Sequence, residues 1–374
     1  MRVIWILFGL LIAIPLGALT WVSSQVDADF LLETASSALE EQGISLLYAG
    51  DSTFSLVPRV HLALSNATII TPETEDSEAQ QITLKDVELT TSLFTFWHSR
   101  RADISARQLT VNDIEIFDFA SPVELIHGLR LEPISATLWQ GEVQGFAQIN
   151  THNNPITIET RGQLDDATAA SLLATVTTLG GAKGTLSAKW DLTVILPDSN
   201  KDIAALNGDM VITGKQVILT EIDLQGGLCK AISRAQGKNG PKWNETGTLF
   251  DRLAVSQSFN GTKAKLDDLV LKTNFVLVQA TADLDRVTEG FTAQASAKLN
   301  TEALSSVPNC RINPRLADIA WPINCRGQLN DGTARSWCTV DVSKIVEEGL
   351  KGELKRRFNL DNPASLIKSL LDRN

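Results

Sequence analysis

Apolar and polar residues alternate along most of this chain, and this alternation constrains its fold more than any other feature. It runs in segments of about eight to twelve residues that Gly, Asn, Asp and Pro interrupt. The clearest segments are 60–70, 81–90, 109–119, 184–196, 209–224, 248–258, 262–284 and 291–299. Successive side chains of a β-strand point to opposite faces, so the period predicts strands with one apolar face. We expect about fifteen strands and a mainly β protein.

One short pattern recurs within these segments. Two apolar positions flank a pair of residues that contains Asn or Asp, so the alternation slips by one residue. The copies are 64–69 (LSNATI), 84–89 (LKDVEL), 111–116 (VNDIEI) and 266–271 (LDDLVL). A β-bulge or a bend produces such a slip, and Asn and Asp tolerate the backbone geometry it needs. The repetition predicts an elongated, twisted antiparallel sheet that grows by adding similar strands.

A few helices are expected to flank the sheet. Residues 27–42 and 165–178 carry apolar residues at helical spacing, and the second stretch divides the strands into two groups. Residues 342–371 read as two amphipathic helices interrupted at Asn362-Pro363. Their basic residues fit either a helix that caps the last strands or one that contacts anionic lipid headgroups.

The amino terminus has the length and composition of a transmembrane anchor. Val3 to Val22 is an uncharged run preceded by Arg2, and Trp5 and Trp21 stand near its two ends. At 1.5 Å per residue, the run would span about 30 Å, the thickness of a bilayer's hydrocarbon core. The positive residue predicts a cytoplasmic amino terminus and a body on the far side of the membrane. A cleaved signal peptide is the alternative, with small residues at Ser23-Ser24.

The four cysteines fit an oxidising compartment, where an even number usually pairs. Cys325 and Cys338 flank a hairpin signal at Asn330-Asp331-Gly332, so a disulfide between them is our first expectation. Cys229 and Cys310 are then the remaining pair and the weaker candidate. Buried free thiols are the alternative reading.

Composition and motifs argue against several functions. A net charge of -11 disfavours nucleic-acid binding, because it would repel phosphate backbones. Metalloprotease, hydrolase, phosphate-loop and calcium-loop motifs are absent from the sequence, and its four histidines lack ligand spacing. We therefore expect no catalytic site, cofactor or metal, and do not expect an enzyme.

Several blocks, taken in order, resemble the carboxy-terminal part of the AsmA family. They are the anchor with its LKDVEL-like strands, GGLCKAISRAQG, the block from Thr248 to Leu284, and WPINCRGQLNDGTARSWCTVDV with Cys325, Gly327, Cys338 and Asp341. Recognisable motifs cover about 226–341. The chain departs from the family at Gln279 to Asp283, where glycines are usual.

The resemblance implies a single-pass protein of the bacterial inner membrane with a periplasmic, groove-like or taco-shaped β-sheet. It is similar to bridge-like lipid-transfer proteins, so it implies a role in outer-membrane biogenesis or in phospholipid transport between membranes. Fifteen strands would give a groove of about 70 Å at most. The candidate lining residues are Leu84, Val87, Leu219, Leu269, Leu271 and Leu277. Membrane phospholipids are the expected partners, envelope proteins are a further class, and the oligomeric state is left open.

Four regions follow from these expectations: an anchor at 1–24, a β-rich half with a leading helix at 25–164, an AsmA-like half at 165–340, and helices at 341–374. Alternation alone is equally compatible with a closed sandwich core. A structural or assembly scaffold for envelope proteins, which carries no lipid, is therefore the second functional hypothesis.

Overall fold

The structure is a computed structural model, and it describes most residues from 45 to 305. Also described are residues 33, 36–37, 310, 320–328 and 338–340. The gaps within 45–305 are 57–58, 71–80, 93, 96–98, 112–113, 126–127, 151–154, 177–180, 197–203, 221–222, 224, 227–228 and 230–246. The expected anchor at 1–24, nearly all of the helix at 27–42, and the helices at 341–374 lie outside the described residues. Within the described part of the chain, no helix is long and apolar enough to cross a membrane.

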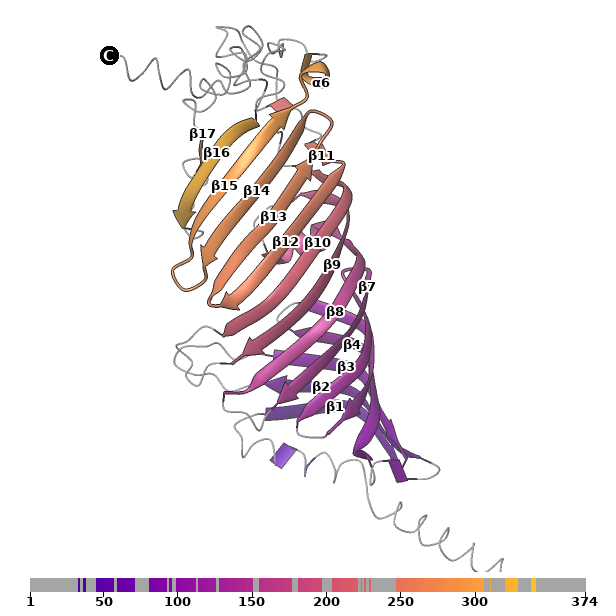
Figure 1. Ribbon diagram of the computed structural model, residues 1–374. Coiled ribbons are helices and arrows are strands. Elements are labelled where there is room, and N and C mark those ends of the chain that lie inside the picture. Colours follow the sequence, from indigo (N-terminus) through magenta and orange to yellow (C-terminus); the bar gives the residue numbers. More distant parts are fainter. Residues whose placement is uncertain are drawn as a thin grey trace, which may run out of the picture. The chain divides into compact units, whose positions relative to one another are not determined.

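The chain forms two compact units, one of residues 1–167 and 190–205 and the other of residues 168–189 and 206–374. The described strands of the first unit are β1 (Ser45–Ser55), β2 (Val60–Ile70), β3 (Gln81–Thr91), β4 (Arg101–Val111), β5 (Ile114–Glu124), β6 (Leu129–Leu138), β7 (Gly141–Asn150) and β8 (Thr157–Thr168). Each is joined by antiparallel pairing to the strand that follows it in the sequence. The unit is therefore a meander of neighbouring strands (Figure 1).

The second unit begins with helix α4 (Ala169–Val176). Its described strands are β10 (Ala205–Leu219), β11 (Thr248–Phe250), β12 (Arg252–Gly261), β13 (Lys263–Lys272), β14 (Val276–Asp285), β15 (Gly290–Leu299), β16 (Ala320–Gln328) and β17 (Cys338–Val340), with helix α6 (Thr301–Ser305) after β15. Strand β9 (Ala182–Ile195) contributes residues to both units. Antiparallel pairing runs from β10 to β12 and then strand by strand to β17.

All of these strands belong to one hydrogen-bonded sheet, so the predictions of a mainly β chain and of a long antiparallel sheet are confirmed. The long segment predicted at 262–284 proves to be two strands, β13 and β14, which a turn at Thr273–Phe275 connects. The expected helix at 165–178 is shorter, because Asp165 and Asp166 belong to β8 and α4 begins at Ala169.

The slips in the alternation correspond to local bends of the strands. In β13, Asp267 and Asp268 are both exposed, and the register with β14 shifts between Leu266 and Leu269. In β3, Asp86 has a φ of +49°, and Lys85 and Asp86 are both exposed between Leu84 and Val87. One left-handed residue thus turns two successive side chains to the same face, as the sequence pattern predicts.

One copy of the pattern was interpreted wrongly. Val111 ends β4 and Ile114 begins β5, so this copy is a connection between two paired strands, not a slip within one strand. An Asn-Asp pair fits both situations, because it favours turns as well as left-handed backbone within strands.

Candidate ligand-binding face

The strands of the second unit carry one continuous apolar face, which the register defines. Residues opposite each other in antiparallel strands share a face. One row across β12 to β16 is therefore Val255, Leu269, Ala280, Ala295 and Ile323, and the next is Leu253, Leu271, Val278, Ala297 and Trp321. On β10, Ile212 and Gly214 extend the two rows. Six strands spaced by about 4.8 Å give this face a width of about 24 Å.

The apolar face is only half-buried. All ten residues of the two rows on β12 to β16 are intermediate between buried and exposed. A face packed against a second layer would be dominated by fully buried side chains, as in a sandwich core. The described strands therefore leave much of this apolar surface accessible.

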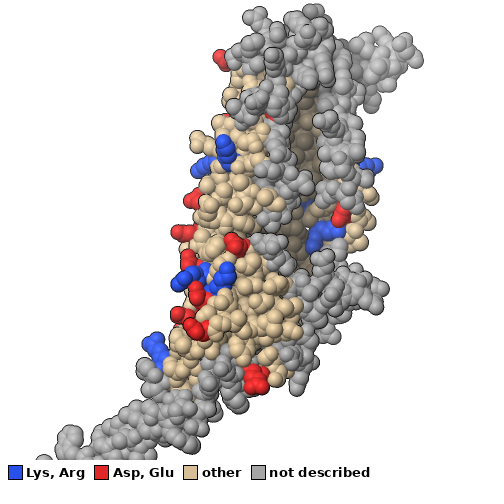
Figure 2. All heavy atoms as spheres, turned by 180° about the vertical axis from the view of Figure 1, so that it is seen from behind, with Lys and Arg blue, Asp and Glu red and all other residues tan. Residues whose placement is uncertain are grey.

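The other face of the same strands is polar. One of its rows is Arg252, Lys272, Leu277, Lys298 and Ala320, and Lys265 on this face forms an exposed ion pair with Asp267 at 3.1 Å. The pKa of Asp267 lies below its ordinary value because the Ser258 hydroxyl and then the Lys265 ammonium donate hydrogen bonds to its carboxylate. Figure 2 shows lysine, arginine and acidic side chains intermixed along the described surface, without a large area of one sign.

The first unit also has an apolar face. The register aligns two rows across β2 to β5, namely Leu64, Val87, Ala106 and Phe119, and Ala67, Leu84, Leu109 and Ile116. Ala67 and Ala106 are buried and the other six side chains are half-buried. On the opposite face, Arg107 and Asp86 form an exposed ion pair at 3.2 Å. Each unit thus separates apolar from charged side chains across its strands.

The predicted lining residues fall on both faces. Leu84 and Val87 lie on the apolar face of the first unit, and Leu269 and Leu271 on that of the second. Leu219 is half-buried near the end of β10, two residues beyond the fully buried Val217. Leu277 is different: its register partners are Lys272 and Lys298, so it lies on the polar face. Reading 262–284 as one strand gave it the wrong phase.

A pocket of about 900 Å³ lies at one end of the strands β12 to β16. Its apolar lining includes Phe259, Ala264, Leu284 and Phe291, which form one row of the apolar face. The charged residues of the lining, Lys263, Lys265, Asp283, Asp285 and Arg326, belong to the neighbouring rows. By the register, these rows lie on the polar face of the sheet.

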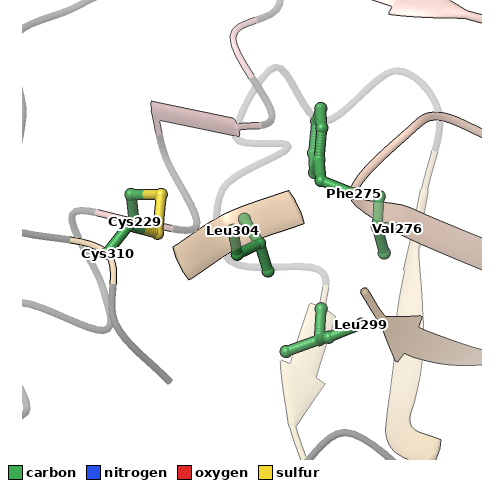
Figure 3. Close-up of a cluster of buried hydrophobic side chains, with 6 residues drawn as sticks. All are labelled: Cys229, Phe275, Val276, Leu299, Leu304 and Cys310. Atoms are coloured by element: carbon green, nitrogen blue, oxygen red, sulfur yellow. A yellow bond between two sulfur atoms is a disulfide. The ribbon is translucent and has the colours of Figure 1, made fainter. Parts of the chain in front are cut away.

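The opposite end of the same strands is covered by a hydrophobic cluster (Figure 3). Its buried members are Cys229, Phe275, Val276, Leu299, Leu304 and Cys310. Val276 and Leu299 are register partners on β14 and β15, and Leu304 lies on α6. A disulfide joins Cys229 to Cys310 across 81 residues of sequence, and both side chains have no exposed surface. The cluster is thus a small core at one end of the apolar face.

The disulfide between Cys229 and Cys310 confirms the pairing that the sequence ranked second. Cys325 is also disulfide-bonded, and it lies opposite Cys338 in the register of β16 and β17. The side chain of Cys338 is outside the described set, so the pair between them stays a prediction.

Trp321 adds an unusual feature next to this cluster. Its ring packs against the cluster, yet its buried indole N–H has no hydrogen-bond partner among the described residues. Trp190 offers a contrast in the first unit, where its indole N–H donates to Thr160 Oγ1 at 3.1 Å. A buried donor without a partner costs about 1–3 kcal/mol.

Sequence reasoning missed several of these features, although signals existed for some. Leu164 and Ala167 of β8 are both buried around the outward pair Asp165-Asp166, and Asp166 has a φ of +55°. This is the same apolar, polar, polar, apolar pattern, so applying it throughout would have found the bend. The cluster around Cys229 had no such signal, because its members are scattered over 81 residues.

Within the described ranges, no group of three or more His, Cys, Asp or Glu side chains is arranged to hold a metal ion. No protein-family model, curated protein or solved structure matches this chain at the significance required.

Proposed function

We propose that this chain is an inner-membrane-anchored periplasmic protein that holds phospholipid acyl chains on its apolar β-faces. Its role would be in outer-membrane biogenesis or in phospholipid transport between the two membranes. The observation that supports this most directly is the half-buried apolar face across β10 and β12 to β16. The run Val3 to Val22 supports the anchor, and the resemblance to the AsmA family supports the compartment and the process.

The energetics favour an apolar occupant. Large accessible apolar surfaces on proteins usually mark binding sites for ligands, membranes or other proteins. Each acyl methylene that leaves water for such a surface contributes roughly 0.8 kcal/mol. A face about 24 Å wide offers room for several chains side by side, while the charged face keeps the protein soluble.

The second candidate function is a scaffold for envelope proteins that carries no lipid. It rests on the same face, because an amphipathic strand or helix of a partner can cover apolar side chains as an acyl chain does. The two proposals differ in what contacts the face in the cell.

Site-specific photo-crosslinking of the full-length protein in bacterial cells tests the proposal. A photoreactive phenylalanine analogue is placed at Leu84, Leu269 or Leu271, in cells whose phospholipids are radiolabelled through phosphate. The matched control is Leu277, which lies in the same hairpin as Leu269 but on the polar face. We expect labelled adducts at the three apolar-face positions and little or no label at Leu277.

Two outcomes would contradict lipid binding. Equal labelling at Leu277 would mean that the adducts reflect general membrane contact. Crosslinks at Leu269 and Leu271 to protein alone, without phospholipid, would favour the scaffold.

A further inference from the structure

We propose that the first unit binds a phosphate-bearing ligand on its polar face, in a pocket where β2 begins, β3 ends and β4 begins. Arg59 and Arg101 hold the phosphate, and neighbouring hydroxyl groups complete its hydrogen bonds. The pocket lies on the face opposite to the one that the proposed function uses, so this inference goes beyond that function and does not rest on it.

The pocket has the size of a small-molecule site. Its volume is about 470 Å³, and such sites usually have roughly 300–1,000 Å³. The described part of its lining consists of two arginines, four residues with hydroxyl groups, Ala102 and Asp103. Most of these side chains can donate hydrogen bonds, as a site for an anion requires.

The register places the pocket on the polar face of the unit. Thr90 and Asp103 are register partners, and they alternate with Leu89 and Ile104, which are partners in a row of the apolar face. Successive side chains of a strand point to opposite faces, so Thr90 and Asp103 lie on the polar face. Arg101 is two residues from Asp103 on β4 and shares its face.

The two arginines of the pocket carry unpaired charges. Arg59 directly precedes β2 and Arg101 begins β4, so both lie at the same end of these strands. Neither forms an ion pair with a described side chain. In contrast, Arg107, Arg130 and Arg161 of the same unit are each paired with a carboxylate. The pocket therefore brings together two guanidinium groups that are available to a ligand.

The nearby carboxylates leave this positive charge in excess. Asp103 is the single acidic residue of the described lining, and Glu124 is the register partner of Arg101 on β5. Neither forms an ion pair with Arg101 within the part of the chain that the structure describes. A guanidinium group matches the geometry of a phosphate and can donate two parallel hydrogen bonds to it. A phosphate is thus the group that this pair of arginines suits.

Hydroxyl groups beside the arginines supply further donors. The hydroxyl groups of Ser92 and Thr95 lie 2.5 Å apart, and Ser92 Oγ also accepts the N–H of Thr95 at 2.9 Å. Only one of these two hydroxyl groups donates to the other, so with respect to the described residues the second keeps its proton for a ligand. The hydroxyl group of Thr90 forms no hydrogen bond with another described residue and is a second donor.

The backbone holds Arg101 in place. The buried Thr91 donates from Oγ1 to the carbonyl of Arg101 at 2.6 Å, which ties the end of β3 to the start of β4. The preceding residue, Arg100, has a left-handed backbone with a φ of +48°, and its carbonyl accepts the N–H of Leu125 at 3.2 Å. Non-glycine residues with such a backbone are concentrated at functional sites.

Isothermal titration calorimetry of the full-length protein tests the site. The protein is reconstituted into nanodiscs of phosphatidylcholine, and empty nanodiscs provide the reference titration. The two probes are glycerol 3-phosphate, a free phosphate ester, and dihexanoylphosphatidylglycerol, which carries a glycerol phosphate as a lipid headgroup. We expect at least one probe to bind. Tighter binding of the first identifies a soluble phosphate ester as the ligand, and tighter binding of the second identifies a lipid headgroup.

Three variants and a control assign the binding to this pocket. Arg59→Gln and Arg101→Gln should each weaken binding at least about tenfold, because each removes a charged donor. Asp103→Asn removes the opposing charge and should tighten binding, which a loss of folding cannot imitate. Arg107→Gln removes the same charge from the polar face of β4 outside the pocket, and it should leave the affinity unchanged.

Two results would overturn the inference. One is the absence of binding heat with both probes. The other is an affinity that stays the same in Arg59→Gln and Arg101→Gln, or that falls equally in Arg107→Gln, because the binding would then not depend on this pair of arginines. Circular dichroism spectra that match the unmodified protein show that each variant is folded.

Discussion

Replacing Cys229 and Cys310 together with alanine removes the link that closes an 81-residue loop. In the chain-entropy account, a crosslink of this span stabilises the folded state by about 4.5 kcal/mol, because it restricts the unfolded chain. The second unit has roughly the size at which 1 kcal/mol shifts the melting temperature by about 2–4 °C. We therefore expect the double variant to unfold some 9–18 °C below the unmodified protein.

The assay is thermal and guanidinium unfolding of the full-length protein, followed by far-ultraviolet circular dichroism with and without a reducing agent. Reduction of the unmodified protein should lower its stability toward that of the double variant. A loss below about 1 kcal/mol would refute the entropic reasoning, because it would mean that the unfolded chain is already restrained without the crosslink. The Cys325→Ala, Cys338→Ala variant is an internal comparison. Its cysteines are 13 positions apart in the sequence. The same relation predicts a loss of about 3 kcal/mol if they are paired.

Further changes test other parts of the structure. Asp86→Val should lower the free energy of unfolding by about 1–2 kcal/mol, because Asp86 has a left-handed backbone that a branched side chain disfavours. Asp86→Gly should lower it little, because glycine adopts this backbone freely. Both variants lose the same exposed ion pair, so their difference in chemical denaturation reports the backbone alone. Trp321→Phe removes an unpartnered buried N–H and should leave the melting temperature unchanged or higher, whereas Trp190→Phe loses a hydrogen bond and should lower it; the reverse order would refute this assignment. The pKa of Asp285 is lowered because the N–H groups of Thr288 and Val287 donate to its carboxylate. This stabilisation is present above the unfolded-state pKa and is lost as pH falls through the folded-state pKa. Asp285→Asn should therefore flatten the decline in stability below about pH 4, and an unchanged acid profile would contradict the role of this turn.

The strands could be predicted from sequence because the signal and the structure have the same period. Residues such as Leu84 and Leu269 fall on the apolar face as the alternation requires, and even the bends at Asp86 and Asp267-Asp268 are visible as slips of one residue. Phase was lost at a turn whose one interrupting residue, Asn274, lies within a long apolar and polar alternation and was not taken as a break. Thr273-Asn274-Phe275 joins β13 to β14, and missing it placed Leu277 on the wrong face.

The hydrophobic cluster around Cys229 and Cys310 could not be predicted in the same way. Its members come from different segments, and a disulfide between Cys229 and Cys310 has no local pattern comparable to the hairpin around Cys325. Pairing across 81 residues depends on where the chain returns to, which alternation does not encode. The half-burial of the apolar side chains could not be predicted either, because it depends on which other segments cover the face. The same alternation would be found in a closed core.

Because each strand pairs with the next one along the chain, almost every contact that a strand needs is available as soon as its successor has been made. Such a chain can fold progressively from its amino-terminal side while later segments are still being synthesised, since few long-range loops must close first. The bond between Cys229 and Cys310 is the exception, as it must wait for 81 further residues. The disulfide can therefore form only after β15 and α6 have been made, whereas β16 and β17 of the same unit still follow in the sequence.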